Sequence, residues 1–225
     1  MKLFKEKKTR YRNLILILLP FLLLGGFFGY TAYKSYKALT TGDDEIEASP
    51  KYSLPEYGYQ LRANCTQLQF DIFQELIEAI TAEEVDEAKV AECIAKNYVT
   101  DFYTWSNKNG MYDVGGMNYV YSPGLANIYV NARDTYYHYL NYYLDEYGQE
   151  KLPEVSSVEA LNVTKGDPIE IDGTSYPVWF VKVHIEFAEK EGGYDTSNIW
   201  KDHDIYVIKN EGTGRYEIAQ AYEGY

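Results

Sequence analysis

The first 33 residues constrain this chain more than any other feature. A basic start, residues 1–12, carries six Lys and Arg residues against the single acid Glu6, and 21 residues without any charge, Asn13 to Tyr33, follow it. A helix of this length matches the hydrocarbon thickness of a bilayer. No charged face interrupts the run, as it would in an amphipathic helix of a soluble protein. We therefore predict a transmembrane helix over residues 13–33.

The rival explanation for this segment is a cleaved signal peptide, which shares the charged start and apolar middle. Cleavage needs small residues at positions −3 and −1, and the run offers only the poorly suited Gly29-Tyr30-Thr31. We expect an uncleaved signal-anchor instead. The positive-inside rule then predicts a single-pass protein of the cell membrane, with the basic tail in the cytoplasm and residues 34–225 outside.

The exported part is predicted to comprise a linker, residues 34–60, and one extracytoplasmic domain, residues 61–225. The linker segment holds Pro50, Pro55 and an acidic cluster, and it shows no steady period. From Gly42 onward the chain has 33 acidic and 13 basic residues, a net charge of −20. So acidic a surface repels nucleic acid and anionic headgroups, which excludes nucleic acid as a partner of this domain.

Three segments of the domain have helical periodicity. Apolar residues recur every three or four positions over residues 65–79 and again over residues 91–105. Thr81 and Glu84 have the spacing of a capping box, which predicts that the second helix starts there. A Ser-Pro pair precedes the third segment, so we expect a third helix over about residues 125–147.

The third segment is unusually rich in tyrosine, in a chain that contains 25 of them. On a helical wheel one face collects Tyr136, Leu140, Tyr143, Leu144 and Tyr147, flanked by Tyr137 and Tyr139, while Tyr142 points outward. Arg133 falls at the edge of the same face and needs an acid if it is buried. Asp113, in the glycine-rich loop of residues 109–124 before the helix, is the predicted partner. The pattern leaves both a polar aromatic core and a ligand pocket open.

The C-terminal third changes to a period of two. Four strands are predicted over residues 155–164, 175–187, 198–209 and 215–222, with a short extension at residues 167–173. Residues 179–187 alternate between an apolar face that includes Trp179 and a polar face that includes His184. One face of the antiparallel sheet should therefore be dry and covered by helices. The fold class is α+β, with three helices packed on a curved four-stranded sheet.

This order of elements, after a single membrane anchor, resembles the nuclear-transport-factor-2-like (cystatin-like) superfamily. Within it, the chain is most similar to the bitopic assembly proteins of type IV secretion and conjugation systems. The resemblance covers about residues 64–225 and depends on element order and topology, with no short motif. It implies a cone-like sheet around an interior cavity, and a role in assembly.

The sequence supplies candidate residues for a pocket but no catalytic or cofactor motif. The predicted lining consists of Trp105, Asp113, Arg133, Tyr136, Tyr137, Tyr143 and Trp179. The most metal-like string is Lys201 to Asp204, but alternation on a strand separates His203 from both aspartates, so we predict no metal site. Cys65 and Cys93 fall on different phases of their helices, which favours free thiols over a disulfide.

Three functions remain in competition. The first is a non-enzymatic, membrane-anchored interaction domain within a cell-envelope assembly, with other envelope proteins as partners. The second is a sensor that binds a small molecule in a tyrosine-lined cavity. The third is an enzyme that uses Asp113 and Arg133. The missing catalytic motif favours the first, and we expect no enzymatic activity and no cofactor.

Overall fold

The computed structural model describes residues 52–223, with side chains up to Ala221. The predicted cytoplasmic tail and transmembrane helix lie outside these residues, as does most of the predicted linker. Among the helices of residues 52–223, none combines the length and apolar character needed to cross a membrane. Residues 52–223 belong to one compact unit, which is described below.

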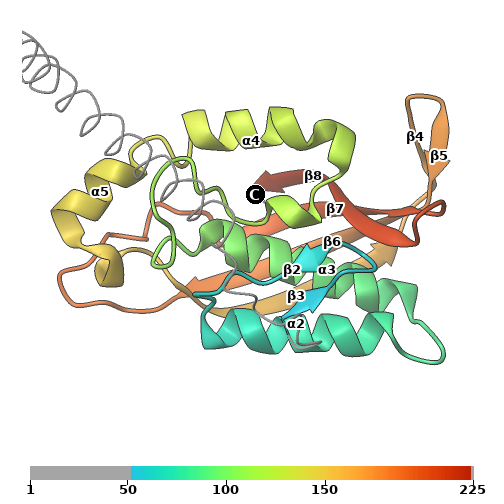
Figure 1. Ribbon diagram of the computed structural model, residues 1–225, viewed down its shortest axis with the longest axis horizontal. Helices are drawn as coiled ribbons and strands as arrows, with labels where there is room; N and C mark the ends of the chain where they lie inside the picture. The colour runs from blue at the N-terminus through green and yellow to red at the C-terminus, as the bar shows by residue number, and fades with distance from the viewer. Residues whose placement is uncertain (1–51, 224–225) are drawn as a thin grey trace, which may run out of the picture. The chain divides into compact units, whose positions relative to one another are not determined.

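The described unit is an α+β domain in which helices precede a sheet (Figure 1). Its α-helices are α2 (Gln67–Ile80), α3 (Glu87–Tyr103), α4 (Leu125–Asp134) and α5 (Leu140–Tyr147). Its strands are β1 (Ser53–Leu54), β2 (Tyr59–Gln60), β3 (Val155–Lys165), β4 (Ile169–Ile171), β5 (Thr174–Tyr176), β6 (Val178–Phe187), β7 (Asp202–Asn210) and β8 (Arg215–Glu223). Short 3-10 turns are η1 (Met117–Tyr119), η2 (Ser122–Gly124) and η3 (Gln149–Lys151).

The main sheet is a four-stranded antiparallel meander in the order β3-β6-β7-β8. The four strands predicted from the period of two are confirmed, within a few residues at their ends. The predicted extension is also real, since β4 and β5 form a hairpin through Asp172 and Gly173, with φ of 52° and 77°. An Asp-Gly pair suits this turn because both positions need positive φ.

One face of the sheet is dry, as the alternation predicted. On β6, Trp179, Val181, Val183, Ile185 and Phe187 are buried in the main core. The opposite face carries His184, whose Nδ1 lies 2.6 Å from Asp202 Oδ1 and whose Nε2 lies 3.1 Å from Glu186 Oε1. These exposed polar contacts contribute little stability. The apolar face decides which side the helices cover.

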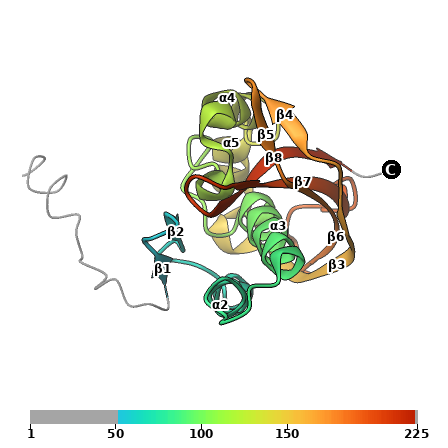
Figure 2. The same ribbon diagram turned by 90° about the vertical axis from the view of Figure 1, so that its right-hand side faces the viewer.

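Helix α3 is the centre of the domain. Figure 2 shows it inside the twisted sheet, with α2 below it and α4 and α5 above. Because the sheet covers one side and α2 the other, residues all around α3 are buried, including Val90, Cys93 and Val99 at 0% exposure. Asn97 Nδ2 donates to the backbone oxygen of Ile72 in α2 at 3.0 Å. Cys93 is therefore buried against α2, whereas the apolar stripe had placed it on an outer face.

The capping box predicted at Thr81 and Glu84 is wrong. Thr81 ends α2, and its Oγ1 donates to Ile77 O at 2.6 Å. Helix α3 begins later, where Asp86 accepts from two backbone N–H groups. The capping box in this part of the chain is formed by Thr66 and Gln69 at the start of α2.

The long third helix predicted over residues 125–147 is also wrong, because two helices occupy it. Helix α4 ends at Asp134, and Thr135 closes it by donating from Oγ1 to Asn131 O at 2.7 Å. Tyr137 then enters the core, where its hydroxyl donates to Phe102 O at 2.6 Å. No proline or glycine lies at this break, so the helical period predicted one continuous helix across it. The described residues thus contain four α-helices, not three.

Candidate functional site

A charged cluster and a cavity lie close together at the C-terminal end of α3. The first surrounds Asp101. Its Oδ1 accepts from Arg62 Nε at 3.1 Å, Gln69 Nε2 at 3.1 Å and Lys108 Nζ at 2.9 Å. Its Oδ2 accepts from the backbone N–H of Gly116 at 2.6 Å. Both carboxylate oxygens are therefore occupied by protein donors.

The charges around Asp101 balance one another. Burial alone would raise the pKa of Asp101, but Lys108 and Arg62 offset it and the pKa falls below its usual value. Burial lowers the pKa of Lys108 to about 8, although Asp101 opposes this shift. Arg62 also holds Asp113, with Nη2 2.9 Å from Oδ1. We call Arg62, Asp101, Lys108 and Asp113 the ionic latch, because together they fasten α3 to the glycine-rich loop.

The ionic latch replaces the predicted pair of Asp113 and Arg133, which is wrong. Arg133 lies on the outer side of α4 and donates from Nε to its neighbour Asp134 at 2.7 Å. Its guanidinium also lies over the ring of Tyr112, 5.9 Å from the centroid. Arg133 therefore contacts Tyr112 of the glycine-rich loop but forms no ion pair with Asp113. Asp113 instead forms an ion pair with Arg62, which lies next to the predicted boundary between the linker and the domain.

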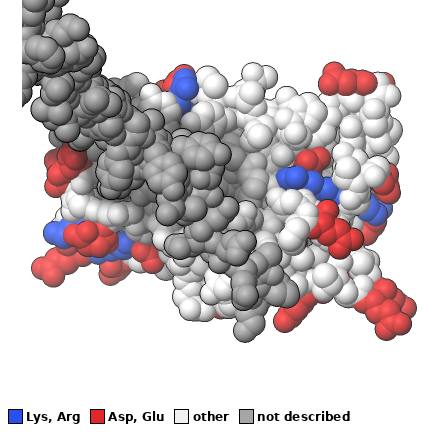
Figure 3. Space-filling model, in the orientation of Figure 1, with Lys and Arg blue, Asp and Glu red and all other residues white. Residues whose placement is uncertain are grey.

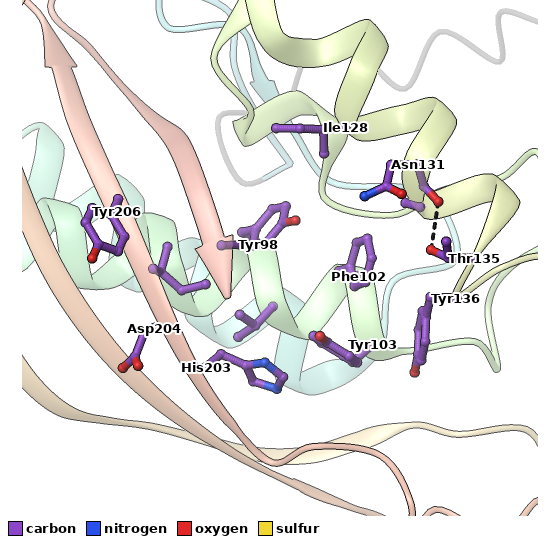
Figure 4. Close-up of a pocket in the computed structure, with 14 residues that line it drawn as sticks. Tyr98, Phe102, Tyr103, Ile128, Asn131, Thr135, Tyr136, His203, Asp204 and Tyr206 are labelled. Carbon is purple, nitrogen blue, oxygen red and sulfur yellow. Dashed lines mark hydrogen bonds between the residues drawn. The ribbon is translucent and has the colours of Figure 1, made fainter. Parts of the chain in front are cut away.

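The second feature is a cavity of about 650 Å³ between α3, α4 and the inner face of β7 and β8 (Figure 4). Its lining combines rings, aliphatic side chains and a few polar groups: Tyr98, Val99, Phe102, Tyr103, Ile128, Asn131, Ala132, Thr135, Tyr136, His203, Asp204, Ile205, Tyr206 and Ala221. This volume is typical of small-molecule pockets. We call it the α3–α4 cavity.

Two of the lining residues border the cavity with their backbone, while their side chains lie on the other face of β7. Figure 4 shows Asp204 and Tyr206 on the far side of β7, away from the α3 rings. Alternation along a strand requires this, because His203 and Ile205 are buried on the inner face. Tyr206 packs edge-on against Phe180 of the outer face, with ring centroids 4.6 Å apart. Among the described side chains that face the α3–α4 cavity, His203 is therefore the one that could carry a charge near neutral pH.

His203 is the main polar group of the cavity wall. Its side chain is buried, at 2% exposure, and its ring stacks on Tyr103 with centroids 4.4 Å apart. Burial lowers the pKa of His203 to about 4, and a hydrogen bond to the backbone of Trp200 only partly opposes this. The imidazole is thus neutral at physiological pH. Its Nε2 has no hydrogen-bond partner among the described residues.

The α4 side of the cavity is more polar and more open. Asn131 and Thr135 are exposed residues on this side, and Figure 4 shows them one turn apart. Thr135 uses its hydroxyl hydrogen on the Asn131 carbonyl. Figure 3 shows uncharged surface along most of the upper edge, where α4 lies, and acidic side chains around the periphery of this face. The cavity therefore joins a polar mouth to an aromatic interior.

The residues predicted to line a pocket are scattered by the fold. Tyr136 alone among the seven lines the α3–α4 cavity. Trp105, Tyr137 and Tyr143 form a second aromatic cluster behind it, in which Trp105 and Tyr136 have centroids 4.6 Å apart. Trp179 lies in the main core beside Tyr216. The tyrosine segment thus supplies one fully buried ring, Tyr137, and three partly buried rings packed on the second cluster, Tyr136, Tyr143 and Tyr147. Tyr139, which the helical wheel placed beside the inward face, is exposed, as is Tyr142.

His203, Asn131 and Thr135 were not predicted as site residues. A signal for His203 was present, because it alternates with Ile205 and Val207 on the dry face of β7. Asn131 and Thr135 carried none, since their position depends on where α4 ends. Cys65 and Cys93 are free thiols. Within residues 52–223, no group of three His, Cys, Asp or Glu side chains has the geometry to hold a metal ion.

Comparison with known proteins does not identify the chain. No protein-family model, no curated protein and no solved structure matches it.

Proposed function

We propose that this chain is a membrane-anchored, non-enzymatic binding protein whose extracytoplasmic domain holds a ligand in the α3–α4 cavity. The observation that carries the proposal is the cavity itself, about 650 Å³ in volume and walled by rings and aliphatic side chains. Ligand sites are mostly apolar concavities with a few polar groups that fix orientation. The α3–α4 cavity has both parts, with His203 inside and Asn131 at the mouth.

A binding role fits these residues better than catalysis. An acid–base mechanism needs two titratable groups that converge on one reacting atom. His203 has no carboxylate beside it on the inner face, since Asp204 points to the outer face. The carboxylates of the ionic latch are already occupied by protein donors. Both arrangements support the expectation of no enzymatic activity.

Topology and fold family complete the proposal. The charge-free run Asn13 to Tyr33, with its basic flank, supports an uncleaved anchor and an outside domain. Helices gathered on one face of a twisted four-stranded meander support the nuclear-transport-factor-2-like cone. In that cone the α3–α4 cavity is the interior space, and the domain acts as a sensor of what enters it.

A second candidate function is an interaction domain within a cell-envelope assembly. Its specific support is a set of exposed tyrosines beside α4 and α5: Tyr112, Tyr139 and Tyr142, at 68%, 61% and 60% exposure. Exposed aromatic side chains are enriched at protein interfaces. A photo-crosslinking residue at Tyr142, compared with one at the exposed Asn162 of β3, tests it in intact cells. A discrete crosslinked product at Tyr142 alone supports an interface, and equal labelling at both contradicts it.

Filling the α3–α4 cavity tests the first proposal. The full chain in lipid nanodiscs is titrated with 4-methylphenol by isothermal calorimetry, with empty nanodiscs as the blank. Ile128→Trp should abolish binding, because the larger ring occupies the cavity. Val130→Trp is the matched control, since Val130 is on the same helix but 44% exposed and outside the lining. Binding that survives in Ile128→Trp would place the ligand elsewhere.

A further inference from the structure

His203 has an unused hydrogen-bonding atom and lies in the wall of the α3–α4 cavity. The side chain is buried and its Nε2 accepts no hydrogen bond from any residue in the described part of the chain. Buried polar atoms nearly always have a partner, so one without a protein partner needs an explanation. His203 also lines the α3–α4 cavity, so the cavity is the space beside its ring from which such a partner would come.

The protonation of the ring fixes what kind of partner it needs. The hydrogen bond to the backbone of Trp200 raises the pKa of His203, which means that the ring donates in it. Burial nevertheless keeps the ring neutral. A neutral imidazole has one donor and one acceptor nitrogen. With the donor committed to Trp200, Nε2 is an acceptor and needs an O–H or N–H group.

Among the described residues, the rest of the cavity wall has no charged side chain facing inward, so it disfavours charged ligands. No Lys or Arg residue lines the α3–α4 cavity, and its single acid, Asp204, faces the other side of the sheet. An anion that entered would lose its hydration without gaining a cation. The acidic domain repels anions at long range as well. The aromatic side chains of Phe102, Tyr103 and Tyr136 in the wall instead suit an apolar aromatic molecule.

We infer that the α3–α4 cavity selects uncharged aromatic molecules that carry a hydrogen-bond donor. In such a complex His203 Nε2 accepts the hydrogen bond from the ligand. This inference rests on the binding role proposed above. Phenols and indoles are the simplest members of the class. Nε2 is shielded from water in the structure, so binding in this way requires a side chain of the wall to move before the donor can reach it. His203 is then a specificity-determining residue, and the rings supply the affinity that all aromatic ligands share.

Three probes that differ in one substituent test this selection. The full chain in nanodiscs is titrated with 4-methylphenol, with 4-methylanisole, whose donor is blocked by a methyl group, and with the anion 4-methylbenzoate. One net hydrogen bond predicts that 4-methylphenol binds about tenfold more tightly than 4-methylanisole. The carboxylate should bind more weakly than either. Equal affinity of the phenol and the anisole would overturn the inference and leave the binding role intact.

A variant and a spectroscopic signal locate the effect at His203. His203→Phe should reduce the preference for the phenol to about onefold and leave the anisole affinity unchanged. If His203→Phe does not fold, the ¹⁵N resonance of Nε2 in the wild-type chain decides, because it should shift with 4-methylphenol and not with 4-methylanisole. An unshifted Nε2 resonance in the phenol complex overturns the role of His203. If neither neutral probe binds at all, the proposed binding function falls together with the inference.

Discussion

Asp101 and Tyr103 are two residues apart on α3, yet they belong to regions with opposite character. Around Asp101 the ionic latch has a protein partner for every carboxylate oxygen. Around Tyr103 the α3–α4 cavity leaves His203 Nε2 without one. A fully paired buried network holds a structure in place. An incompletely paired wall beside open space is suited to recognition, so the same helix anchors the loop and forms the binding surface.

The difference between the two regions also separates the possible roles of charge. The ionic latch concentrates charged groups and neutralises them internally. The α3–α4 cavity excludes them, and its titratable residue stays neutral because of burial. Variants in the ionic latch should therefore change stability first, whereas variants in the cavity should change binding and pH dependence.

The largest effect should come from Asp101→Ala. Lys108, whose side chain is fully buried, would lose its carboxylate partner, and breaking a buried pair in this way costs ~3–5 kcal/mol in the free energy of unfolding. Asp71→Ala is the control, because Asp71 is exposed on α2 and surface changes stay within ~0.5 kcal/mol. Urea unfolding measures both. Equal midpoints for the two variants would show that the ionic latch does not stabilise the domain.

His203 should make stability depend on pH. Its pKa is about 4 in the folded state and near 6.5 when unfolded. As pH falls, the unfolded state binds the proton first, so this stability is complete above about pH 6.5 and is lost as pH falls toward about 4. Between pH 7 and pH 4.5 the wild type should lose about 2 to 3 kcal/mol more than His203→Phe. Parallel pH profiles in urea unfolding would contradict the buried neutral imidazole.

Gly115→Ala should have a smaller effect on the ionic latch. A Cβ at this position would lie 2.1 Å from the backbone oxygen of Asp101. Forcing such a contact costs ~1–3 kcal/mol. Gly124→Ala is the matched control, since its Cβ would meet nothing within 4 Å, and we expect it to be neutral or to stabilise by ~0.4–1 kcal/mol. Similar melting of both variants would mean that the loop does not pack tightly on α3.

Arg133→Ala should have no measurable effect on melting. Its guanidinium lies on the surface beside Asp134 and Tyr112, and no buried carboxylate depends on it. Thermal melts of this variant and the wild type should coincide. A clear loss of stability would restore the interior arginine that the helical wheel predicted and would weaken the separation between the ionic latch and α4.

Periodicity predicted the sheet well because its signal is local. Each strand has a buried face and a solvent-facing one, and the Asp172-Gly173 pair in the sequence indicates the turn between β4 and β5. The helices were harder, since α3 is buried all around and a single apolar stripe describes it poorly. The end of α4 depends on Tyr137 entering the core, a tertiary contact without a local sequence signal.

Most residues of the candidate site were not predicted from the sequence. An aromatic pocket was one of two alternatives for the tyrosines, and of the residues named for it only Tyr136 lines the α3–α4 cavity. His203 was recognised as facing away from its aspartates, but not as a buried neutral acceptor. The ionic latch was missed because Arg62 lies 39 residues from Asp101 in the sequence. Contacts over such separations follow from packing, which composition and spacing do not encode.

The most direct test of the α3–α4 cavity as the binding site is a chemical-shift map. The ¹⁵N-labelled full chain in nanodiscs is titrated with 4-methylphenol, and amide shifts are followed residue by residue. We predict that the largest changes fall on Phe102, Asn131 and His203, while Gly115 in the glycine-rich loop stays unshifted. Changes centred on the glycine-rich loop, or on the exposed Tyr142, would contradict the assignment of ligand binding to the α3–α4 cavity.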